Sequence, residues 1–567
     1  MRLVFDIEAN GLSEVTLVGP KKKISPEADT IWCLCVIDID TGKEYSYGPG
    51  EISEGVKLLN KATLLIGHNI IGYDIPMLER VHGKISDCKI FDTLIASRLK
   101  YPDRDNHPFG GNSLRSWGIH LGCFKDDYDK GFDSYCKEML SYCKQDVEVT
   151  LRVYEALKNV EEEMSLPFAI EHAIAKIIAE QTDNGMGFDL QGAHDLEQEL
   201  IMERVTIEDE FNTLFPPIVE KRFHKTTGKP LKDKITYFNP GSRKMIAERL
   251  GEKYGWIPPK TDKGNAKVDE AVLKELKYPE AEKLIEYFYI IKLLGFIRDW
   301  ITRAVNSRDG RIHCSINTQG AVSGRMTCSQ PNLQQVSSDP RARSLFKPRD
   351  GWVQVGIDAS GLEARLLASR MAKYDDGSFG EVVLNGDIHS ANQEAAGLPT
   401  RDSAKTFFFA LIYGAGDGKI GSIVGKGAKA GKEVKETFFK KMPALKKVLD
   451  NCHFQIAKKG TVTLLDNREV PCRAKHKALN VQIQGDGAIL MKVAQAIFRK
   501  KLEAKYPEQY SFMMTVHDEW QVECDPVIAE DVGALGCKSI EEAAVFLNCR
   551  IKMEGNAIIG FNWKECH

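Results

Sequence analysis

The chain has 567 residues, of which 43% are hydrophobic and 28% charged, and its formal net charge is −3. This length predicts about two to four domains, and the composition is that of a globular protein rather than a disordered one. No run approaches the roughly 18 apolar residues that span a bilayer, which excludes a membrane helix. The fourteen cysteines form no CxxC pair, so we expect reduced, mostly buried thiols of a cytoplasmic protein. An apolar strand follows the amino terminus directly, so no signal peptide is expected.

The first 160 residues alternate between strand-like and helix-like stretches. Apolar runs at 3–9, 31–39 and 63–69 predict strands, and the patterns at 76–82 and 92–99 predict helices. This alternation predicts an α/β domain.

Residues 165 to 310 are mainly helical in pattern, with predicted helices at 169–182, 242–250 and 281–300. Between them, residues 221–234 carry six Lys or Arg and one Asp. Such a run is usually a solvated loop, and the alternative is a segment that holds a phosphate backbone.

A second α/β region begins near residue 310. A strand is predicted at 352–358 and a helix at 362–372, and helical patterns continue to about residue 500. The segment 511–524 then predicts a pair of strands joined by a tight bend.

Asp6 and Glu8 interrupt the first predicted strand, in the segment VFDIEAN. Because side chains alternate faces along a strand, these two carboxylates should lie side by side, where their charges repel. A hard cation such as Mg²⁺ between them would offset the repulsion. Asp-x-Glu is also common at strand ends in a structural role, so this pair alone does not identify a metal site.

Three further side chains complete a possible two-metal site. GHNIIGYD ends in Asp74, and YCKQD places Tyr142 and Asp146 four residues apart on one helix face. Two metals about 3.5–4 Å apart could activate a water molecule, oriented by Tyr142, and stabilise the leaving oxygen of a phosphodiester. In this order, DxE, HNxxxYD and YxxxD resemble the proofreading 3′→5′ exonuclease domain of DNA polymerases, which is RNase H-like. The resemblance implies that this domain spans residues 1–160, with metal ligands at Asp6, Glu8, Asp74 and Asp146.

A second carboxylate set lies in the carboxyl-terminal half. Asp358 ends a predicted buried strand, where α/β proteins often place functional groups, and Glu363 follows on the next helix. Asp518 and Glu519 lie at the bend of the predicted hairpin, in the segment TVHDEWQV. The alternative for such a bend is an ordinary polar turn.

One helix between these acids carries a distinctive stripe. Arg401, Lys405, Phe409 and Tyr413 recur at a spacing of four, with Thr400 as the expected N-cap. Gly414 is the expected helix stop. Cations near the helix start would offset triphosphate charge, and aromatic faces would stack on a base. A half-buried amphipathic helix would explain the aromatic residues but not the two cations.

The combination resembles family A DNA polymerases, and most closely the replicative polymerases of T-seven-like bacteriophages. The likeness runs nearly end to end, through GIDASGLE, LNGDIHS, LPTRDSAKTF, YGAGDGKIG, FNPGSR, QPNLQQ and NWKECH. It implies a multidomain α/β protein in which a right-hand polymerase follows the exonuclease domain. The implied parts are a helical thumb at 161–310, an antiparallel-sheet palm at 311–372 and 498–567, and helical fingers at 373–497.

The resemblance also implies roles for individual residues. Asp358 and Asp518 would hold two Mg²⁺ ions, with Glu519 beside them as a further catalytic residue, and carboxylate sites of this kind accept Mn²⁺ as well. The incoming nucleotide would be bound by Arg401, Lys405, His389, Phe409 and Tyr413, and Glu363 would exclude a ribose hydroxyl. The implied contacts to the primer–template duplex are Arg325, Asn332, Asn480, Gln484 and His517.

Two departures from the closest relatives carry predictions. Phe409 stands where those phage enzymes have Tyr, whose hydroxyl can replace the missing 3′-hydroxyl of a dideoxynucleotide, so we expect strong discrimination against dideoxynucleotides. Between Phe211 and FNPGSR the chain has only a short basic segment, where the relatives carry a long thumb insertion that recruits thioredoxin. We therefore do not expect a thioredoxin clamp. No 5′-nuclease domain is expected before the exonuclease motif.

The implied function is viral DNA replication in the host cytoplasm, with primer–template DNA and dNTPs as partners and a replisome helicase–primase left open. Three alternatives fit these residues less well. A single-subunit RNA polymerase would lack Glu363 and the exonuclease acids. A nuclease with a vestigial polymerase, or a non-catalytic DNA-binding scaffold, would not retain two full carboxylate sets.

Overall fold

The computed structural model describes residues 1–12, 14–18, 23–25, 27–104, 110–124 and 128–567. The chain forms two compact units. The first comprises Met1–Gly187, Ser307–Val336 and Phe346–His567, and the second comprises Phe188–Asn306 and Ser337–Leu345. Each unit is described by itself.

The amino-terminal part of the first unit is built on a five-stranded sheet in the order β5–β4–β1–β6–β7. β1 pairs antiparallel with β4 and parallel with β6, so the sheet is mixed. The predicted strands at 3–9, 31–39 and 63–69 are confirmed as β1, β4 and β6. The strands are β1 (Arg2–Ala9), β4 (Ile31–Asp38), β5 (Lys43–Tyr47), β6 (Leu64–Gly67) and β7 (Lys89–Asp92).

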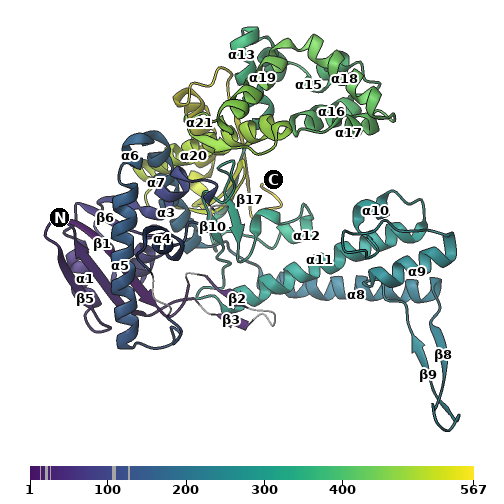
Figure 1. Ribbon diagram of the computed structural model, residues 1–567, viewed down its shortest axis with the longest axis horizontal. Coiled ribbons are helices and arrows are strands. Elements are labelled where there is room, and N and C mark those ends of the chain that lie inside the picture. The colour runs from purple at the N-terminus through teal and green to yellow at the C-terminus, as the bar shows by residue number, and fades with distance from the viewer. Residues whose placement is uncertain (13, 19–22, 26, 105–109, 125–127) are drawn as a thin grey trace. The chain divides into compact units, whose positions relative to one another are not determined.

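The alternation of side chains along β1 divides the core into two layers. Leu3, Phe5 and Ile7 belong to one buried cluster, and Val4 belongs to another on the opposite face. Asp6 and Glu8 therefore share the face of Val4, which α5 covers (Figure 1). The flanking elements are β2 (Thr16–Val18), β3 (Lys23–Ser25), α1 (Ile52–Leu59), α2 (Asp74–His82), α3 (Thr93–Lys100), α4 (Leu114–Leu121), α5 (Lys137–Leu157), α6 (Val160–Glu163) and α7 (Ser165–Asn184).

A second, fully antiparallel sheet lies in the carboxyl-terminal part of the same unit, in the order β15–β16–β12–β17. The predicted strand at 352–358 is β12, and the predicted strand pair at 511–524 is β15 and β16. The bend between them is the two residues His517 and Asp518. The strands are β12 (Val353–Ala359), β15 (Tyr510–Val516), β16 (Glu519–Cys524) and β17 (Gly555–Gly560).

Helices account for most of the chain between β12 and β15, as predicted, although a short hairpin of β13 and β14 interrupts them. The helices are α13 (Leu362–Asp375), α14 (Ser378–Asn385), α15 (Ile388–Ala396), α16 (Arg401–Ile412), α17 (Asp417–Ile423), α18 (Ala428–Lys441), α19 (Pro443–Lys459) and α20 (Ala478–Lys505), with α21 (Ala529–Phe546) after β16. The remaining short elements are β10 (Ser315–Asn317), β11 (Thr327–Ser329), β13 (Thr461–Thr463), β14 (Glu469–Pro471) and the 3₁₀ helices η2 (Leu333–Gln335), η3 (Lys475–Lys477) and η4 (Pro526–Ile528).

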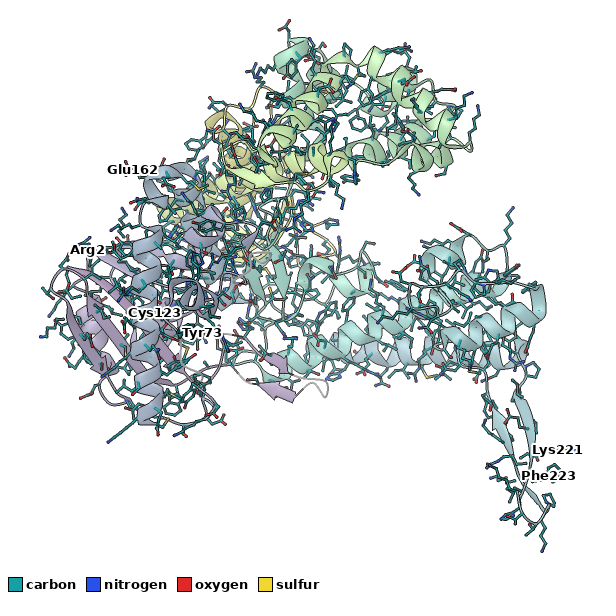
Figure 2. The ribbon with its side chains drawn as sticks, in the orientation of Figure 1. Arg2, Tyr73, Cys123, Glu162, Lys221 and Phe223 are labelled. Atoms are coloured by element: carbon teal, nitrogen blue, oxygen red, sulfur yellow. The ribbon has the colours of Figure 1, made fainter. Side chains whose placement is uncertain are left out.

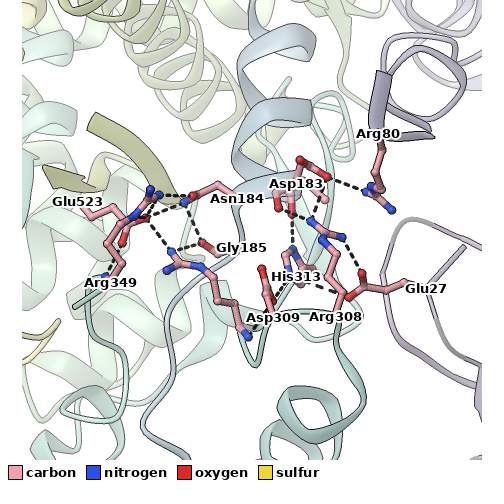
Figure 3. A network of polar contacts seen from close by, with 12 residues as sticks. Glu27, Arg80, Asp183, Asn184, Gly185, Arg308, Asp309, His313, Arg349 and Glu523 are labelled. Carbon is pink, nitrogen blue, oxygen red and sulfur yellow. Dashed lines mark hydrogen bonds and ion pairs between the residues drawn. The ribbon is translucent and has the colours of Figure 1, made fainter. Parts of the chain in front are cut away.

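A polar network joins distant segments of the first unit (Figure 3). Glu523 of β16 is fully buried, and its Oε1 accepts hydrogen bonds from Arg311 at 2.9 Å and from Nη2 of Arg349 at 2.6 Å. Arg308 reaches Glu27 Oε2 at 2.6 Å and Asp183 Oδ1 at 3.0 Å. Nδ2 of Asn184, the last residue of α7, also donates to Oε1 of Glu523 at 3.2 Å, so the end of α7 is tied both to the carboxyl-terminal sheet and to the amino-terminal segment.

The second unit is helical, with the predicted helices at 242–250 and 281–300 confirmed as α9 and α11. A hairpin of β8 and β9 extends from it, away from α8 and α9 (Figure 1). The elements are α8 (Leu190–Leu214), β8 (Ile218–Phe223), β9 (Pro230–Thr236), α9 (Arg243–Tyr254), α10 (Glu270–Lys274), α11 (Pro279–Asn306) and α12 (Pro340–Arg343).

The prediction of a loop at 221–234 is wrong, because this segment forms most of the β8–β9 hairpin. Val219 pairs with Ile235 and Phe223 with Pro230, so backbone hydrogen bonds hold two strands that have no buried face. Figure 2 shows Lys221 and Phe223 on this hairpin with their side chains directed away from the ribbon, and Phe223 is 58% exposed. The segment is solvated, as expected, but it is ordered by strand pairing.

The structure also tests the predictions about the cysteines and about membrane helices. All fourteen cysteines are free thiols, and most are buried, as expected. Within the part of the chain that the structure describes, no helix has both the length and the apolar character needed to cross a bilayer.

Candidate active sites

The amino-terminal acids lie together as the strand pattern predicts. In the register of β1 and β4, Asp6 lies opposite Cys35 and Glu8 opposite Cys33. One carboxylate oxygen each of Asp6 and Glu8 and the Sγ of Cys143 lie within 4.8 Å of one another. Cys143 is on α5, and its thiol donates to the carbonyl oxygen of Asp6 at 3.4 Å. Sequence reasoning missed Cys143; its spacing of three from Asp146 on one helix face was the available signal.

Asp74 extends this acidic cluster from the start of α2. Its side chain is 3% exposed, and its Oδ1 accepts a hydrogen bond from the backbone N–H of Ile7 at 3.1 Å, between Asp6 and Glu8. Burial raises the pKa of Asp74 to about 7, with the charges of Asp92 and Asp146 adding to the effect and the Ile7 amide opposing it. This accumulation of negative charge fits a bound divalent cation, which would stabilise the ionised carboxylates.

Asp92 holds the loop that precedes Asp74, a role that sequence reasoning missed. It is 1% exposed, and its carboxylate accepts the backbone N–H groups of Asn69 at 3.0 Å, Ile71 at 3.2 Å and Leu94 at 2.9 Å. One side chain therefore caps α3 and fixes the GHNIIGYD loop. The signal was an Asp directly before a helical pattern, a typical N-cap.

Helix α5 supplies the last two predicted residues. Asp146 is 3% exposed and contributes to the raised pKa of Asp74. Tyr142 lies beside Cys143 in the sequence, and its ring centroid is 5.4 Å from that of Tyr128. A hydrogen bond with Cys136, burial and the nearby charge of Glu8 raise the pKa of Tyr128 to about 12. The tyrosine pair is thus at the edge of the acidic cluster.

The carboxyl-terminal acids meet on adjacent strands. Asp358 of β12 lies opposite Glu519 of β16, and the backbone N–H of Ala359 donates to the carbonyl oxygen of Asp518 at 3.0 Å. Partial desolvation at the end of β12 raises the pKa of Asp358 to about 7 although the side chain still reaches solvent, and the charges of Asp518 and Glu519 add to the effect. This set also fits a divalent cation, because three carboxylates lie close together and a bound cation would offset their mutual repulsion.

Glu519 differs from the two aspartates in its partners. Its side chain is 5% exposed; its Oε1 accepts from the indole Nε1 of Trp563 at 2.8 Å, and its Oε2 lies 3.1 Å from Nδ1 of His567. The last residues of the chain therefore engage Glu519, whereas Asp358 is exposed. Sequence reasoning noted the terminal NWKECH segment but not its contact with Glu519.

The turn between β15 and β16 is strained. His517 has a φ of +52°, a region that residues other than glycine rarely adopt. Such strain is typical of functional sites, where the surrounding structure must hold the backbone in place.

Glu363 lies between the His517–Asp518 turn and helix α16. Its Oε1 accepts from Nη2 of Arg325 at 3.3 Å, and its Oε2 accepts from the hydroxyl of Tyr413 at 3.0 Å. Arg325, Glu363, His517 and Asp518 line one small cavity. The predicted nucleotide-binding and duplex-binding residues therefore meet beside a predicted metal ligand.

The predicted stripe on α16 is confirmed. Arg401, Lys405 and Tyr413 are exposed and Phe409 is half-buried, whereas Phe407 and Phe408 on the other face are fully buried. Thr400 and Ser403 form a capping box at the helix start.

Gly414 ends the helix with a φ of +78°, where a Cβ atom would lie 2.0 Å from the carbonyl oxygen of His476. Both predicted helix boundaries therefore have a physical cause.

His389 joins this stripe from α15. Its ring centroid is 6.3 Å from that of Phe409, and burial together with the charges of Arg401 and Lys405 lowers its pKa. Arg401 donates from Nε to Oδ2 of Asp387 at 2.7 Å, a partner that sequence reasoning missed. The three predicted triphosphate ligands converge on one exposed region.

The remaining predicted duplex contacts are more dispersed. Asn480 and Gln484 lie one turn apart on α20 and are half-buried, and Asn332 is exposed just before η2. None of these three is among the residues that line the cavity of Arg325 and His517.

Comparisons with known proteins agree with this geometry. The protein-family model of DNA polymerase family A matches residues 218–565. The chain is 30% identical to the DNA-directed DNA polymerase of Enterobacteria phage T3 and 30% identical to that of Escherichia phage T7, and each alignment covers 100% of both proteins.

A solved structure also has the same fold. The polymerase domain of Pol1 from M. smegmatis, in complex with DNA primer–template and dNTP, matches 100% of this chain and 96% of its own chain with a TM-score of 0.79. Its sequence is 18% identical, so this match concerns the fold alone.

Proposed function

The chain belongs to DNA polymerase family A, and we propose that its carboxyl-terminal site extends a primer with dNTPs in the order that a template strand dictates. The observation that carries this proposal is the link from Asp518 through Arg325 and Glu363 to Tyr413, which caps the carboxyl-terminal end of α16. It connects an acidic pair suited to phosphoryl transfer with an exposed stripe suited to a nucleoside triphosphate.

In this proposal side chains of the protein bind the metal ions, orient the triphosphate and select the incoming nucleotide. Asp358 and Asp518 hold the cations; two bound Mg²⁺ ions would stabilise the attacking and leaving oxygens of an in-line displacement at the α-phosphate. Arg401 and Lys405 would offset the charge of the triphosphate and His389 would help to position it, and Phe409 would pack against the incoming nucleotide. Arg325, Asn332, Asn480, Gln484 and His517 contact the duplex through phosphates and minor-groove edges, while base pairing reads the sequence.

Glu363 would select against ribonucleotides. Because Arg325 and Tyr413 each hold one of its carboxylate oxygens, this side chain cannot rotate away without breaking both contacts. A fixed carboxylate beside the sugar would exclude a 2′-hydroxyl, which is the role that the family resemblance suggests.

The proposed domain organisation follows the same resemblance. An RNase H-like exonuclease domain would occupy 1–160, a thumb 161–310, a palm 311–372 and 498–567, and fingers 373–497. The antiparallel sheet of β12, β15, β16 and β17 supports the palm assignment, because all four strands fall within those two palm segments.

We further propose that the amino-terminal site is a 3′→5′ proofreading exonuclease. Asp6, Glu8, Asp74 and Asp146 would hold two Mg²⁺ ions, and Tyr142 would orient the attacking water molecule. The clustering of Asp6 and Glu8 and the raised pKa of the buried Asp74 support this assignment.

The β8–β9 hairpin is proposed to bind the phosphate backbone of the primer–template duplex. Residues 218–236 contain six Lys or Arg and two acids, and the whole hairpin is solvent-exposed apart from a half-buried Thr236. A thioredoxin clamp is not part of the proposal, because the long insertion is missing here. A replisome helicase–primase is included as the partner that would supply primers.

The polymerase assignment is tested with a labelled primer–template in Mg²⁺, incubated with four dNTPs, with four rNTPs, or without nucleotides. We expect template-dependent lengthening with dNTPs and shortening without nucleotides. Shortening alone would contradict the polymerase assignment. Lengthening with rNTPs would contradict the role of Glu363.

The role of the hairpin is tested by the salt dependence of DNA binding. The triple variant Lys225→Gln, Lys229→Gln and Lys232→Gln should reduce the slope of log K against log salt by about 3, since each phosphate contact contributes about 0.9. The matched control replaces three exposed lysines of the amino-terminal domain, Lys57, Lys61 and Lys158, and should leave the slope unchanged. Equal slopes in all three proteins would refute the proposal.

A further inference from the structure

Thr515 is held from three sides just before the His517–Asp518 turn. It is 3% exposed, and its hydroxyl accepts a hydrogen bond from Nε2 of Gln495 at 2.9 Å and donates to Oε1 of Gln181 at 2.8 Å. Its carbonyl oxygen accepts from Nε2 of Gln334 at 3.2 Å. The hydroxyl thus uses both its donor and its acceptor capacity in a buried environment.

The three glutamines come from separate elements. Gln181 is on α7, Gln495 on α20 and Gln334 in η2. Gln181 is 2% exposed and Gln495 is fully buried, so their amides have no bulk water to replace a lost partner. Loss of either bond to the Thr515 hydroxyl would leave a further buried polar group without a partner, which is unfavourable, so the bonded arrangement is favoured. The end of β15 is therefore located by groups outside its own sheet.

The strained turn lies directly after Thr515 in the chain. Only Val516 separates Thr515 from His517, whose φ of +52° must be maintained by the surroundings. The next residue, Asp518, is joined to β12 through the hydrogen bond from Ala359 N–H to its carbonyl oxygen. The position of Asp518 relative to Asp358 thus depends on how the end of β15 is held.

The network also borders the proposed polymerase site. Gln334, Gln495 and Thr515 line the same small cavity as His517 and Asp518.

We propose that Thr515 is a positioning residue of the polymerase reaction, and that Gln181, Gln334 and Gln495 act through it to set the separation of the Asp358 and Asp518 carboxylates. This inference rests on the proposed polymerase function. The three glutamines do not contact the substrate in this proposal.

The test compares Thr515→Val, which keeps the shape and removes both side-chain hydrogen bonds, with Thr515→Ser, which keeps the hydroxyl. Thr150→Val is the control for replacing a fully buried threonine elsewhere, because Thr150 is fully buried on α5 in the amino-terminal domain. Single-nucleotide incorporation is measured across a Mg²⁺ series for kcat and for KM of the dNTP. Binding of Mn²⁺ to the protein–DNA complex is measured separately by electron paramagnetic resonance.

Thr515→Val should lower kcat at least tenfold with KM for the dNTP within twofold of wild type. It should also raise the half-saturating Mg²⁺ concentration and weaken Mn²⁺ binding severalfold. Thr515→Ser should restore these values to within twofold, and Thr150→Val should not change them. Primer shortening should be unaffected in all variants.

Gln495→Met provides a second variant should Thr515→Val fold poorly, because it removes one donor to the hydroxyl and leaves the bond to Gln181. A lower melting temperature with unchanged kcat and metal dependence would overturn the proposal, since the network would then be structural only. An inactive wild type would instead refute the polymerase assignment itself.

Discussion

The two acidic clusters of this chain are assembled in different ways. Asp6 and Glu8 share one face of a single strand, and buried acids from α2 and α5 complete the amino-terminal set. In the carboxyl-terminal set, Asp358 is the last residue but one of β12, and Asp518 lies in the turn before the neighbouring strand β16. In each set, desolvation raises the pKa of one acid, Asp74 or Asp358, to about 7, and the charges of neighbouring carboxylates add to the effect. A desolvated acid beside other carboxylates, rather than any one motif, is the shared feature.

The hydrogen bonds that hold the backbone beside each cluster also differ. A charged group, Asp92, holds the amino-terminal loop by its backbone N–H groups. Neutral amides hold the carboxyl-terminal turn through Thr515. The loop of the first site is held by a residue 21 to 23 positions away in the chain, whereas one of the residues that hold the turn of the second site is 334 positions away.

The largest expected effect concerns the carboxyl-terminal acids. Asp518→Asn should reduce primer extension about a thousandfold, because loss of metal coordination removes several kcal/mol of transition-state stabilisation. Glu519→Gln should cost roughly tenfold, since Trp563 and His567 already engage this side chain. Steady-state extension assays on one primer–template measure both. Equal losses would contradict the distinction between these acids.

The next largest effect on primer extension is expected for Lys405, which lies with Arg401 on the exposed face of α16. Lys405→Gln should lower kcat/KM for dNTPs roughly 10- to 100-fold, as expected for a lost charged hydrogen bond. Primer shortening should be unchanged. Lys419→Gln on the neighbouring α17 is the control, since Lys419 is also exposed. A loss of similar size in the control would indicate a general charge effect.

Phe409 is expected to determine how strongly the protein discriminates against dideoxynucleotides. In Phe409→Tyr the added hydroxyl could replace the missing 3′-hydroxyl of a dideoxynucleotide, so discrimination against dideoxynucleotides should fall about tenfold or more. The ratio of kcat/KM for dCTP and ddCTP opposite template guanine measures this. If the wild type already used ddCTP as readily as dCTP, the prediction would be wrong.

The smallest expected effect tests the polar network around α7 (Figure 3). Asp309 lies 2.9 Å from His313, and despite burial this contact lowers the pKa of Asp309 to about 2. Because the folded-state pKa lies below the ordinary value of about 3.9, the contribution to stability is present above about pH 4 and is lost as the pH falls toward 2.

Asp309→Asn should therefore destabilise the protein at pH 7 by at most ~1 kcal/mol, and the difference from wild type should shrink by pH 3. Thermal unfolding at both pH values measures it. A difference that grows as the pH falls would contradict the assignment.

Features set by neighbouring residues were predictable from the sequence. The shared face of Asp6 and Glu8 follows from strand alternation, and the boundaries of α16 follow from Thr400 and Gly414. The bend that carries Asp518 follows from polar residues between two apolar runs. Each of these depends on a few consecutive residues.

Features set by distant partners were not predictable. Gln181 and Thr515 are 334 residues apart, and nothing in either segment indicates the other. The β8–β9 hairpin was missed for another reason: its strands are rich in charged residues and have no buried face, so the usual alternation is weak.

We propose that two independent metal-dependent sites act in opposite directions on one primer end. The most direct test uses a labelled, 3′-mismatched primer with dNTPs in wild type, Asp6→Asn and Asp518→Asn. We predict that the wild type removes the mismatch and then extends, that Asp6→Asn does not remove it yet still extends a matched primer, and that Asp518→Asn only shortens. Loss of both activities in either single variant would contradict the independence of the two sites.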